Sequence, residues 1–514
     1  MIRLGRRAAV AALALPWAAA RAAGTLNVAL ESEVVILDPH ATTAAITRTF
    51  ASHVFDTLFA MDAEGMIQPQ MVESWDVSAD GLAWNFLLRP GLRWHDGAPV
   101  TGQDCVASLE RWAPRDALGR MLWATKAEIG ATGARGFRIA LKTPFPLMLD
   151  VLGKPNAPLP VMLPERLAAV AVETRIREFV GSGPFRFRAA DWRPGASMVL
   201  ERNPDYVSRT EPASFLAGGR NVKIDQMTWR AMPDQATGAT ALMAGELDYM
   251  QYLPFDWIPR LERARGVRLM GLGGIHQFQG NFRINHAAAP FDDPAIRRVL
   301  WHCADQASIL TAIGVPPQYR APPCPSFFLC NGPLDSRQGE EATRFDPAAA
   351  RAALAATSYR GQPIAFLTTQ GGISQTAAQV MTQSMQQAGF RVEEQVMDWG
   401  TLLARRARRE GWNMFSVYAN GTDMISPLTH FYVANTCADY PGWDCDPGLR
   451  ALIDAFAVAP DGGARRALAG QIQAAAVAHT PSVMWGQFTI PAGYRTRLRN
   501  MPQAAYPMFW EVEV

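Results

Sequence analysis

Residues 364–419 alternate between short apolar runs and longer amphipathic runs, and this alternation restricts the fold more than any other feature of the chain. The pattern predicts strands at 364–369, 391–398 and 413–419, and helices at 374–389 and 401–410. The first helix is expected to begin with Ser374 as its N-cap and to end at Gly389. Strands that are joined through helices lie parallel in one sheet, so this segment predicts an open α/β sheet.

The loops after these three strands carry side chains suited to binding a polar ligand. In an open α/β sheet, ligands bind beyond the carboxyl ends of the strands. Here those ends are Gln370-Gly371-Gly372, Asp398-Trp399-Gly400 and Asn420-Gly421-Thr422-Asp423. We expect them to face one cleft, with five ligand-binding residues: Gln370, Trp399, Tyr418, Asn420 and Asp423. None of these residues is assigned a catalytic role.

The sequence contains no recognisable catalytic or phosphate-binding motif. It has no GxSxG, no HExxH and no GxxxxGK[ST], and GLGGIH at 271–276 does not fit a dinucleotide-binding loop. The 8 histidines are scattered singly along the chain. A secreted hydrolase is therefore the least favoured class, and we expect neither an enzyme nor a cofactor.

Residues 1–23 are typical of a secretory signal peptide. Basic residues (Arg3, Arg6 and Arg7) precede an apolar run, and small residues follow up to Gly24. The Arg6-Arg7 pair leaves the twin-arginine export route open beside the general one. No later apolar run reaches the roughly 20 residues of a membrane-spanning helix. We therefore expect a periplasmic protein that does not itself span the membrane.

Composition restricts the partners of the mature protein. The chain has 514 residues, enough for two or three domains, and its 49% hydrophobic content is that of a well-packed globular protein. It has 49 basic and 47 acidic residues, and the signal peptide removes four arginines, which leaves 45 against 47 and a net charge of about −2. A surface without net positive charge does not support binding to nucleic acid.

Four of the 6 cysteines form two close pairs. Cys324 and Cys330 close one short, turn-rich loop, and Cys437 and Cys445 close another. In an oxidising compartment such pairs are expected to be disulfides rather than metal ligands, and no CxxC occurs. The other two are expected to be buried thiols on apolar helical faces: Cys105 and Cys303.

The pair His95-Asp96 is expected to have a structural role. It follows a predicted hairpin that turns at Pro90-Gly91, and Asp96-Gly97 is a dipeptide typical of turns. Residues 101–104 fit a capping box at the start of the next helix. The pair therefore lies where a strand stops and a turn begins.

Segment 73–112 (ESWDVSADGLAWNFLLRPGLRWHDGAPVTGQDCVASLERW) closely resembles the signature segment of periplasmic solute-binding proteins of ABC importers. The branch is extracellular solute-binding protein family 5, which includes the peptide- and nickel-binding receptors. Three further segments resemble blocks of this family in the same order: 181–206 (GSGPFRFRAADWRPGASMVLERNPDY), 289–310 (APFDDPAIRRVLWHCADQASIL) and 345–355 (FDPAAARAALA). Four blocks in order make the resemblance specific.

The resemblance implies a two-lobed periplasmic binding protein of the α/β class (type II, cluster C-like) with an additional inserted domain. The expected boundaries are 1–23 for the signal peptide, 24–60, 180–264 and 488–514 for the first lobe, 61–179 for the inserted domain and 265–487 for the second lobe. The resemblance also implies delivery of the captured solute to the transmembrane subunits of an ABC permease. The receptor itself is expected to be a monomer.

The ligand implied by the resemblance is a peptide or a similar amino-bearing solute. Peptide-binding members pair the ligand's amino group with an Asp after the third strand, and Asp423 matches best, although the family's Asp-Pro-Asp is here Ser426-Pro427-Leu428. Dipeptide receptors hold the ligand carboxylate with an Arg near the end of the first strand, whereas TTQGG at 368–372 has none. A receptor for a metal complex, haem or another non-peptide solute stays an alternative, without an assigned metal site. The candidate ligands for that alternative are His276, His286 and His430.

Overall fold

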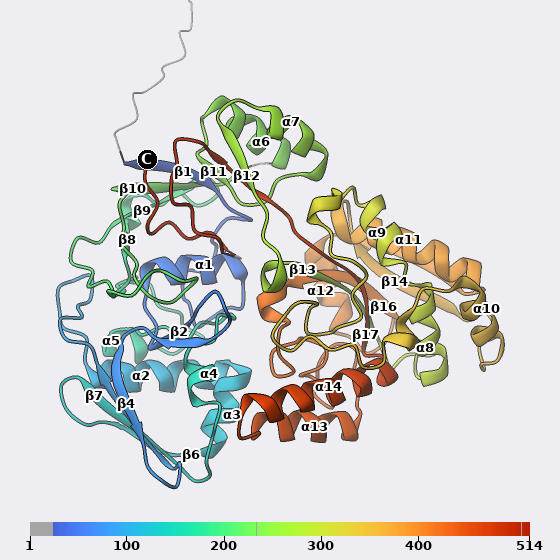
Figure 1. Cartoon of the computed structure of the whole chain (residues 1–514), viewed down its shortest axis with the longest axis horizontal. Helices are drawn as coiled ribbons and strands as arrows, with labels where there is room; N and C mark the ends of the chain where they lie inside the picture. Colours follow the sequence, from blue (N-terminus) through green and yellow to red (C-terminus); the bar gives the residue numbers. More distant parts are fainter. Residues whose placement is uncertain (1–23, 233, 505) are drawn as a thin grey trace, which may run out of the picture.

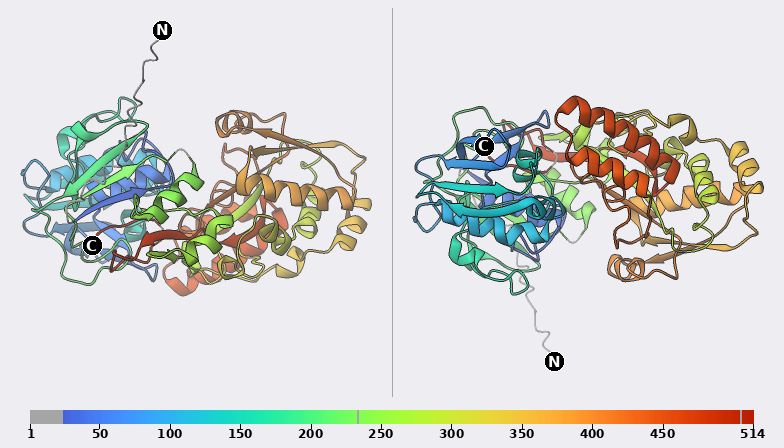
Figure 2. Two further views of the ribbon diagram at one scale, coloured as in Figure 1. Left: turned by 90° about the horizontal axis from the view of Figure 1, so that it is seen from above. Right: turned by 90° about the horizontal axis from the view of Figure 1, so that it is seen from below.

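The computed structural model describes residues 24–514 apart from 233 and 505. The expected signal peptide at 1–23 lies outside the described residues. Within the described part of the chain, no helix has both the length and the apolar character needed to cross a membrane. Figures 1 and 2 show two bodies side by side, each with its own large sheet. We call the body with the seven-stranded sheet the first lobe and the body with the five-stranded sheet the second lobe.

The first lobe contains a mixed sheet in the order β12-β18-β11-β1-β10-β9-β8. Its strands are β1 (Thr25–Ala29), β8 (Phe185–Phe187), β9 (Ser197–Arg202), β10 (Gln226–Arg230), β11 (Tyr249–Met250), β12 (Val267–Met270) and β18 (Ala492–Arg495). The helices of this lobe are α1 (Ala45–Val54), α6 (Gln235–Ala244) and α7 (Ile258–Arg263). β1 is parallel to both of its neighbours, and its Leu26 and Val28 are fully buried, as in a sheet covered on both faces.

The second lobe contains a sheet in the order β15-β14-β16-β13-β17. Its strands are β13 (Phe278–Ile284), β14 (Pro363–Thr369), β15 (Arg391–Met397), β16 (Met414–Asn420) and β17 (Ser482–Phe488). Its helices are α8 (Pro294–Cys303), α9 (Gln306–Ala312), α10 (Pro347–Ala355), α11 (Gly372–Ala388), α12 (Trp399–Arg406), α13 (Pro447–Ala457) and α14 (Gly462–His479). β14 is parallel to both β15 and β16, which confirms the alternating pattern predicted for this segment.

Two helix starts in this segment differ from the prediction. α11 begins at Gly372 after Gly371, and Ser374 is a buried residue inside the helix rather than its N-cap. Gly371 has φ 75°, a left-handed conformation that glycine adopts without steric cost. α12 begins at Trp399 because the Asp398 side chain accepts a hydrogen bond from Thr401 N–H and caps the helix. Trp399 therefore belongs to a helix and not to a loop.

A four-stranded antiparallel sheet in the order β4-β5-β7-β6 lies below the first sheet in Figure 1. The elements of this part are β2 (Phe59–Met61), β3 (Ile67–Pro69), β4 (Val72–Val77), β5 (Ala83–Leu88), β6 (Lys126–Ala131), β7 (Gly136–Leu141), α2 (Gly102–Trp112), α3 (Ala117–Thr125), α4 (Met148–Leu152) and α5 (Glu165–Ala168). The predicted hairpin at Pro90-Gly91 was wrong, because β5 pairs with β4 and β7 instead. The capping box at Thr101 and Asp104 is confirmed.

His95 and Asp96 have the structural role predicted for them. Gly181 N–H donates to His95 Nδ1 at 3.2 Å, and His95 Nε2 lies 3.0 Å from Gly183 O. Asp96 Oδ1 accepts a hydrogen bond from Ala98 N–H at 3.0 Å within its own turn. His95 thus holds the turn before α2 against the chain that returns to the first lobe.

The chain crosses between the lobes at 271–277 and again at 489–491. Thr489 Oγ1 donates to Leu272 O at 2.5 Å, so the two crossing segments are tied to each other. The predicted boundary at 264/265 would separate β12 from the sheet in which it pairs with β18. The rest of the predicted division into lobes and an inserted domain stays a prediction.

Candidate ligand-binding site

The five predicted ligand-binding residues lie at or just after the ends of three neighbouring strands of the second lobe, and their common role in binding stays a prediction. Three of them come from the end of β16 and from the short helix η7 (Gly421–Asp423): Tyr418, Asn420 and Asp423. Asn420 is buried, and its Oδ1 accepts a hydrogen bond from Thr422 Oγ1 at 3.5 Å. Gln370 is exposed, and its N–H donates to Met397 O of the edge strand β15. Trp399 is 47% exposed and lies against the guanidinium of Arg406, also beside that edge.

Asp423 forms an ion pair that joins the two lobes. Its Oδ1 accepts a hydrogen bond from Arg48 Nη1 of α1 at 2.9 Å and another from Asn156 Nδ2 at 2.7 Å. Asn156 Nδ2 also donates to Thr422 O at 2.9 Å. The Arg48 side chain is 1% exposed and that of Asp423 17%, so water screens this pair far less than a surface ion pair. Both bonds go to Oδ1, and among the described residues Oδ2 of Asp423 accepts none.

Arg48 is surrounded by groups that favour its charged form. Burial alone would lower the pKa of Arg48, but Asp423, Tyr506 and Glu31 outweigh this effect and the pKa rises. The guanidinium carbon lies 4.2 Å from the centre of the Tyr506 ring, a cation–π contact. The buried Nε of Arg48 has no hydrogen-bond partner within the described part of the chain. This cation therefore keeps an unused donor at the junction of the lobes.

Glu31 supplies a second carboxyl group near Arg48. Burial raises the pKa of Glu31, against the opposing effects of Arg48 and of the Tyr252 hydroxyl. Tyr252 Oη donates to Glu31 Oε2 at 3.3 Å, and Glu31 N–H donates to Gln251 Oε1 at 2.9 Å. The site therefore contains one buried cation and two carboxyl groups.

Tyr418 belongs to an aromatic cluster of the second lobe. Its ring lies 5.5 Å from that of Phe278 and 5.9 Å from that of Phe488. Phe278 also contacts the ring of Tyr252 at 5.5 Å, which connects this cluster to Glu31. Burial raises the pKa of Tyr418, and the charge of Glu31 adds to the rise.

Three side chains of the site were not found from the sequence: Glu31, Arg48 and Asn156. Arg48 lies 375 residues from Asp423 along the chain and Asn156 lies 267, so no local motif joins them. In the structure Arg48 lies in α1, where every residue from Ile46 to Val54 is buried. A buried arginine requires a partner, but the sequence does not say which carboxylate supplies it.

The three histidines considered as metal ligands lie in separate surroundings. His430 Nε2 is 3.3 Å from Gln279 Oε1, and His286 Nε2 is 3.0 Å from Thr480 O. His276 is on the first segment that crosses between the lobes. Over residues 24–514 without 233 and 505, no group of three or more His, Cys, Asp or Glu side chains is placed to hold a metal ion.

The cysteine predictions are confirmed. Cys324 is bonded to Cys330 and Cys437 to Cys445, with Cα–Cα distances of 5.8 and 4.1 Å. The two remaining cysteines are buried thiols: Cys105 and Cys303. Burial raises the pKa of the Cys303 thiol to about 12 and that of Cys105 further, so neither is a reactive thiolate.

The family model for bacterial extracellular solute-binding proteins, family 5 Middle, matches residues 66–442. This chain belongs to that family. The resemblance seen in four sequence blocks is thereby confirmed, and the class of protein is a solute-binding receptor. A relative in Sinorhizobium fredii, "Probable peptide ABC transporter periplasmic-binding protein y4tO", is 32% identical to this solute-binding protein over 98% of its chain and 97% of the relative.

Solved structures share the fold of this family 5 protein. DppA of Helicobacter pylori, in complex with the peptide STSA, has a TM-score of 0.77 at 19% identity, with 96% of this chain and 98% of DppA covered. NikZ of Campylobacter jejuni, in complex with Ni(L-His), has a TM-score of 0.79 at 15% identity, with 96% and 100% covered. The two-lobed α/β fold that the sequence predicted is therefore confirmed.

Proposed function

We propose that this receptor binds a peptide, or a similar amino-bearing solute, between its two lobes and that Asp423 is the principal contact for the ligand's amino group. The relative in Sinorhizobium fredii, which aligns over nearly the whole chain, carries a peptide-transport name, and this supports the ligand class. The observation that carries the proposal is the Asp423 carboxylate at the junction of the lobes, with one oxygen occupied and the other available.

The chemistry of the site fits an ammonium group. Oδ2 of Asp423 keeps its lone pairs for an incoming donor, and the second carboxyl group, Glu31, adds negative charge nearby. Arg48 already balances one of these two charges, so an ammonium group would balance the other. A charge-assisted hydrogen bond in such a poorly hydrated place contributes more than one at the surface.

The proposal extends to the transport cycle of the family. The receptor would capture its solute in the periplasm as a monomer and deliver it to the transmembrane subunits of an ABC permease, without catalysing a reaction. The N-terminal pattern of the sequence supports export. Cell fractionation tests the location, because a protein that stays in the cytoplasm with its first 23 residues intact would contradict it.

A peptide-retention experiment tests the ligand class and the role of Asp423. The wild-type protein is incubated with tripeptides of random sequence that have either free or acetylated amino termini. The peptides that stay bound are identified by their mass in native mass spectrometry. We expect the free peptides to be retained and the acetylated ones to be lost. Equal retention of both pools would show that the amino group is not recognised.

Asp423→Asn preserves shape and removes the charge. We expect the best retained tripeptide to bind at least about tenfold more weakly by calorimetry, which corresponds to about 1.4 kcal/mol. The melting temperature should also fall, because the buried Arg48 loses its charged partner. The matched control is Asp292→Asn at an exposed position. A lower melting temperature with affinity within about twofold of wild type would mean that Asp423 only stabilises the closed lobes.

A further inference from the structure

A disulfide-closed loop of the second lobe lies directly behind the turn that carries Asp423. Every residue from Cys324 to Cys330 is buried, although none belongs to a helix or strand. Loops are normally exposed because their backbone polar groups need water. A buried loop must therefore satisfy these groups with other partners.

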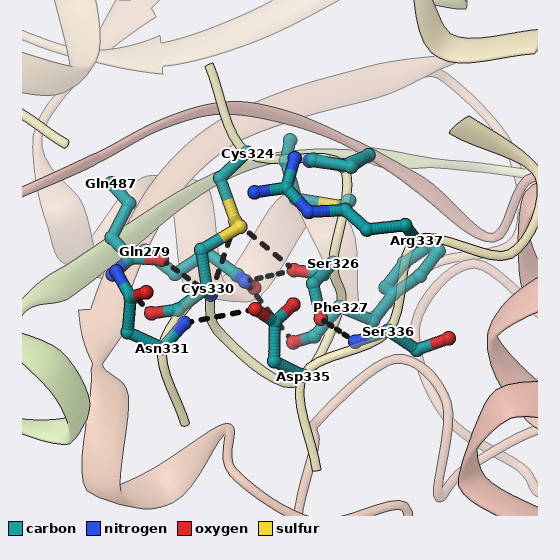
Figure 3. Close-up of a disulfide and its surroundings, with 12 residues drawn as sticks. Gln279, Cys324, Ser326, Phe327, Cys330, Asn331, Asp335, Ser336, Arg337 and Gln487 are labelled. Atoms are coloured by element: carbon teal, nitrogen blue, oxygen red, sulfur yellow. Dashed lines mark hydrogen bonds between the residues drawn. A yellow bond between two sulfur atoms is a disulfide. The ribbon is translucent and has the colours of Figure 1, made fainter. Parts of the chain in front are cut away.

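Glutamine side chains supply those partners. Gln279 Nε2 donates to Ser326 O and to Phe327 O, each at 3.0 Å (Figure 3). Three further glutamines bond the loop backbone: Gln473 at Phe327 N–H and Pro325 O, Gln306 at both polar groups of Cys324, and Gln487 at both polar groups of Cys330. The four amides come from β13, α14, α9 and β17, so the loop is fixed to the framework of the lobe.

Leu329, near the end of this loop, is held in an unfavourable backbone conformation. Its φ is 65°, and its side chain is 0% exposed. A left-handed backbone is sterically unfavourable for a residue with a Cβ, and it persists where the surroundings fix it. Here the backbone is fixed by the hydrogen bonds from the glutamine side chains and by the disulfide that joins the two ends of the loop.

The Leu329 side chain enters an apolar cluster between the lobes. The interlobe apolar cluster consists of Ala60, Met61, Phe215, Leu216, Ala217, Ile275, Leu329, Ile425, Ala504, Tyr506, Met508 and Trp510. Leu329 Cδ1 lies 2.6 Å from where a Cβ on Gly421 would stand, so it rests on the backbone of η7. Tyr506, whose ring stacks on Arg48, is in the same cluster. The charged site and this apolar cluster are therefore adjacent.

We propose that Leu329 is a specificity-determining residue that limits the size of the ligand group next to the amino group at Asp423. This inference rests on the proposed peptide-binding function. When the lobes separate, Leu329 loses its contacts with the first lobe but keeps its position, because the loop is bonded to the second lobe. A peptide whose first side chain is small fits beside it, whereas a large aromatic one meets the leucine.

A competition experiment tests this role. Two tripeptide pools with free amino termini, one beginning with Ala and one with Trp, are mixed with the protein and compared by native mass spectrometry. Wild type should prefer the Ala pool, and Leu329→Ala should shift the ratio toward the Trp pool by at least about tenfold. Leu329→Met, which retains the volume, should keep the wild-type ratio.

The control is Leu449→Ala, which removes a buried leucine of α13 elsewhere in the second lobe. It should lower the melting temperature, as core truncations do, without moving the ratio. If Leu329→Ala leaves the ratio unchanged while Asp423→Asn still weakens binding, the role of Leu329 is refuted and the peptide function stands. If wild type retains neither pool, both are refuted.

Discussion

Arg48 and Asp423 depend on each other because both are largely removed from water. The attraction within a buried ion pair is offset by the cost of desolvating its two charges, so the pair adds little net stability. Removal of one partner is costly, since it leaves the other charge without compensation in a poorly hydrated place. In this structure Arg48 provides this compensation for Asp423 from the opposite lobe. A ligand ammonium group would share the carboxylate with Arg48.

Replacement of Arg48 by Met should therefore separate stability from binding. The variant should melt at a lower temperature, because Asp423 loses its charged partner. It should bind the best retained amino-terminal tripeptide more tightly, by on the order of 1 kcal/mol, because a neighbouring positive charge no longer repels the ligand's ammonium group. Thermal melts and calorimetry measure the two effects. Arg202→Met, at an arginine that is 48% exposed, is the control. Weaker binding by a folded Arg48→Met protein would show instead that Arg48 attracts the ligand.

At the scale of elements, the sequence predicted the strands and helices that depend only on the residues of their own segment. The strands and helices from β14 to β16 were predicted because each carries its own periodicity, and Asp423 was found because it follows β16. Non-local pairing was not predictable, as for β5, whose apolar residues pair with β4 and β7 across the sheet. The same limit applies to the site. Arg48 and Asn156 meet Asp423 only when the lobes come together.

The turn before α2 should make the stability of the protein depend on pH. Burial lowers the pKa of His95 to about 4, and its Nδ1 accepts from Gly181 N–H only while neutral. In the unfolded chain the same histidine takes up a proton near pH 6.5. Stability should therefore fall as the pH drops from about 6.5 to 4, by at most about 1.4 kcal/mol per unit from this residue. Urea unfolding between pH 7 and 4 gives the number of protons that the chain takes up when it unfolds. His95→Gln should lower this number by about one. An unchanged number would contradict this assignment.

At the scale of the whole molecule, the lobes touch through polar contacts and through apolar ones, among them the interlobe apolar cluster. Besides the pair of Arg48 and Asp423, a second ion pair connects the lobes. Its atoms are Arg465 Nη1 of α14 and Asp150 Oδ2 of α4, which lie 3.6 Å apart. A cavity of about 30 Å³ lined by Tyr252 and Phe278 lies beside the crossing segments. That space suits a few water molecules and is too small for a peptide. Asp423 lies at the junction of the lobes with 17% of its side chain exposed, so we expect a ligand to reach it when the lobes separate about the segments 271–277 and 489–491.

We expect the lobes to exchange between open and closed forms. Ligand favours closure only through contacts that exist in the closed form. Asp423→Asn combined with Asp150→Asn weakens both ion pairs between the lobes, so the empty double variant should show a larger radius of gyration in small-angle scattering than empty wild type. Asp150→Asn alone should change little, because that pair is 22% and 48% exposed and exposed pairs contribute at most about 1 kcal/mol.

Saturation with the best retained tripeptide should reduce the radius of gyration of both proteins, with the greater reduction in the double variant because more of its molecules start open. If neither protein contracts with a peptide that calorimetry shows to be bound, the ligand does not bind by closure of the lobes.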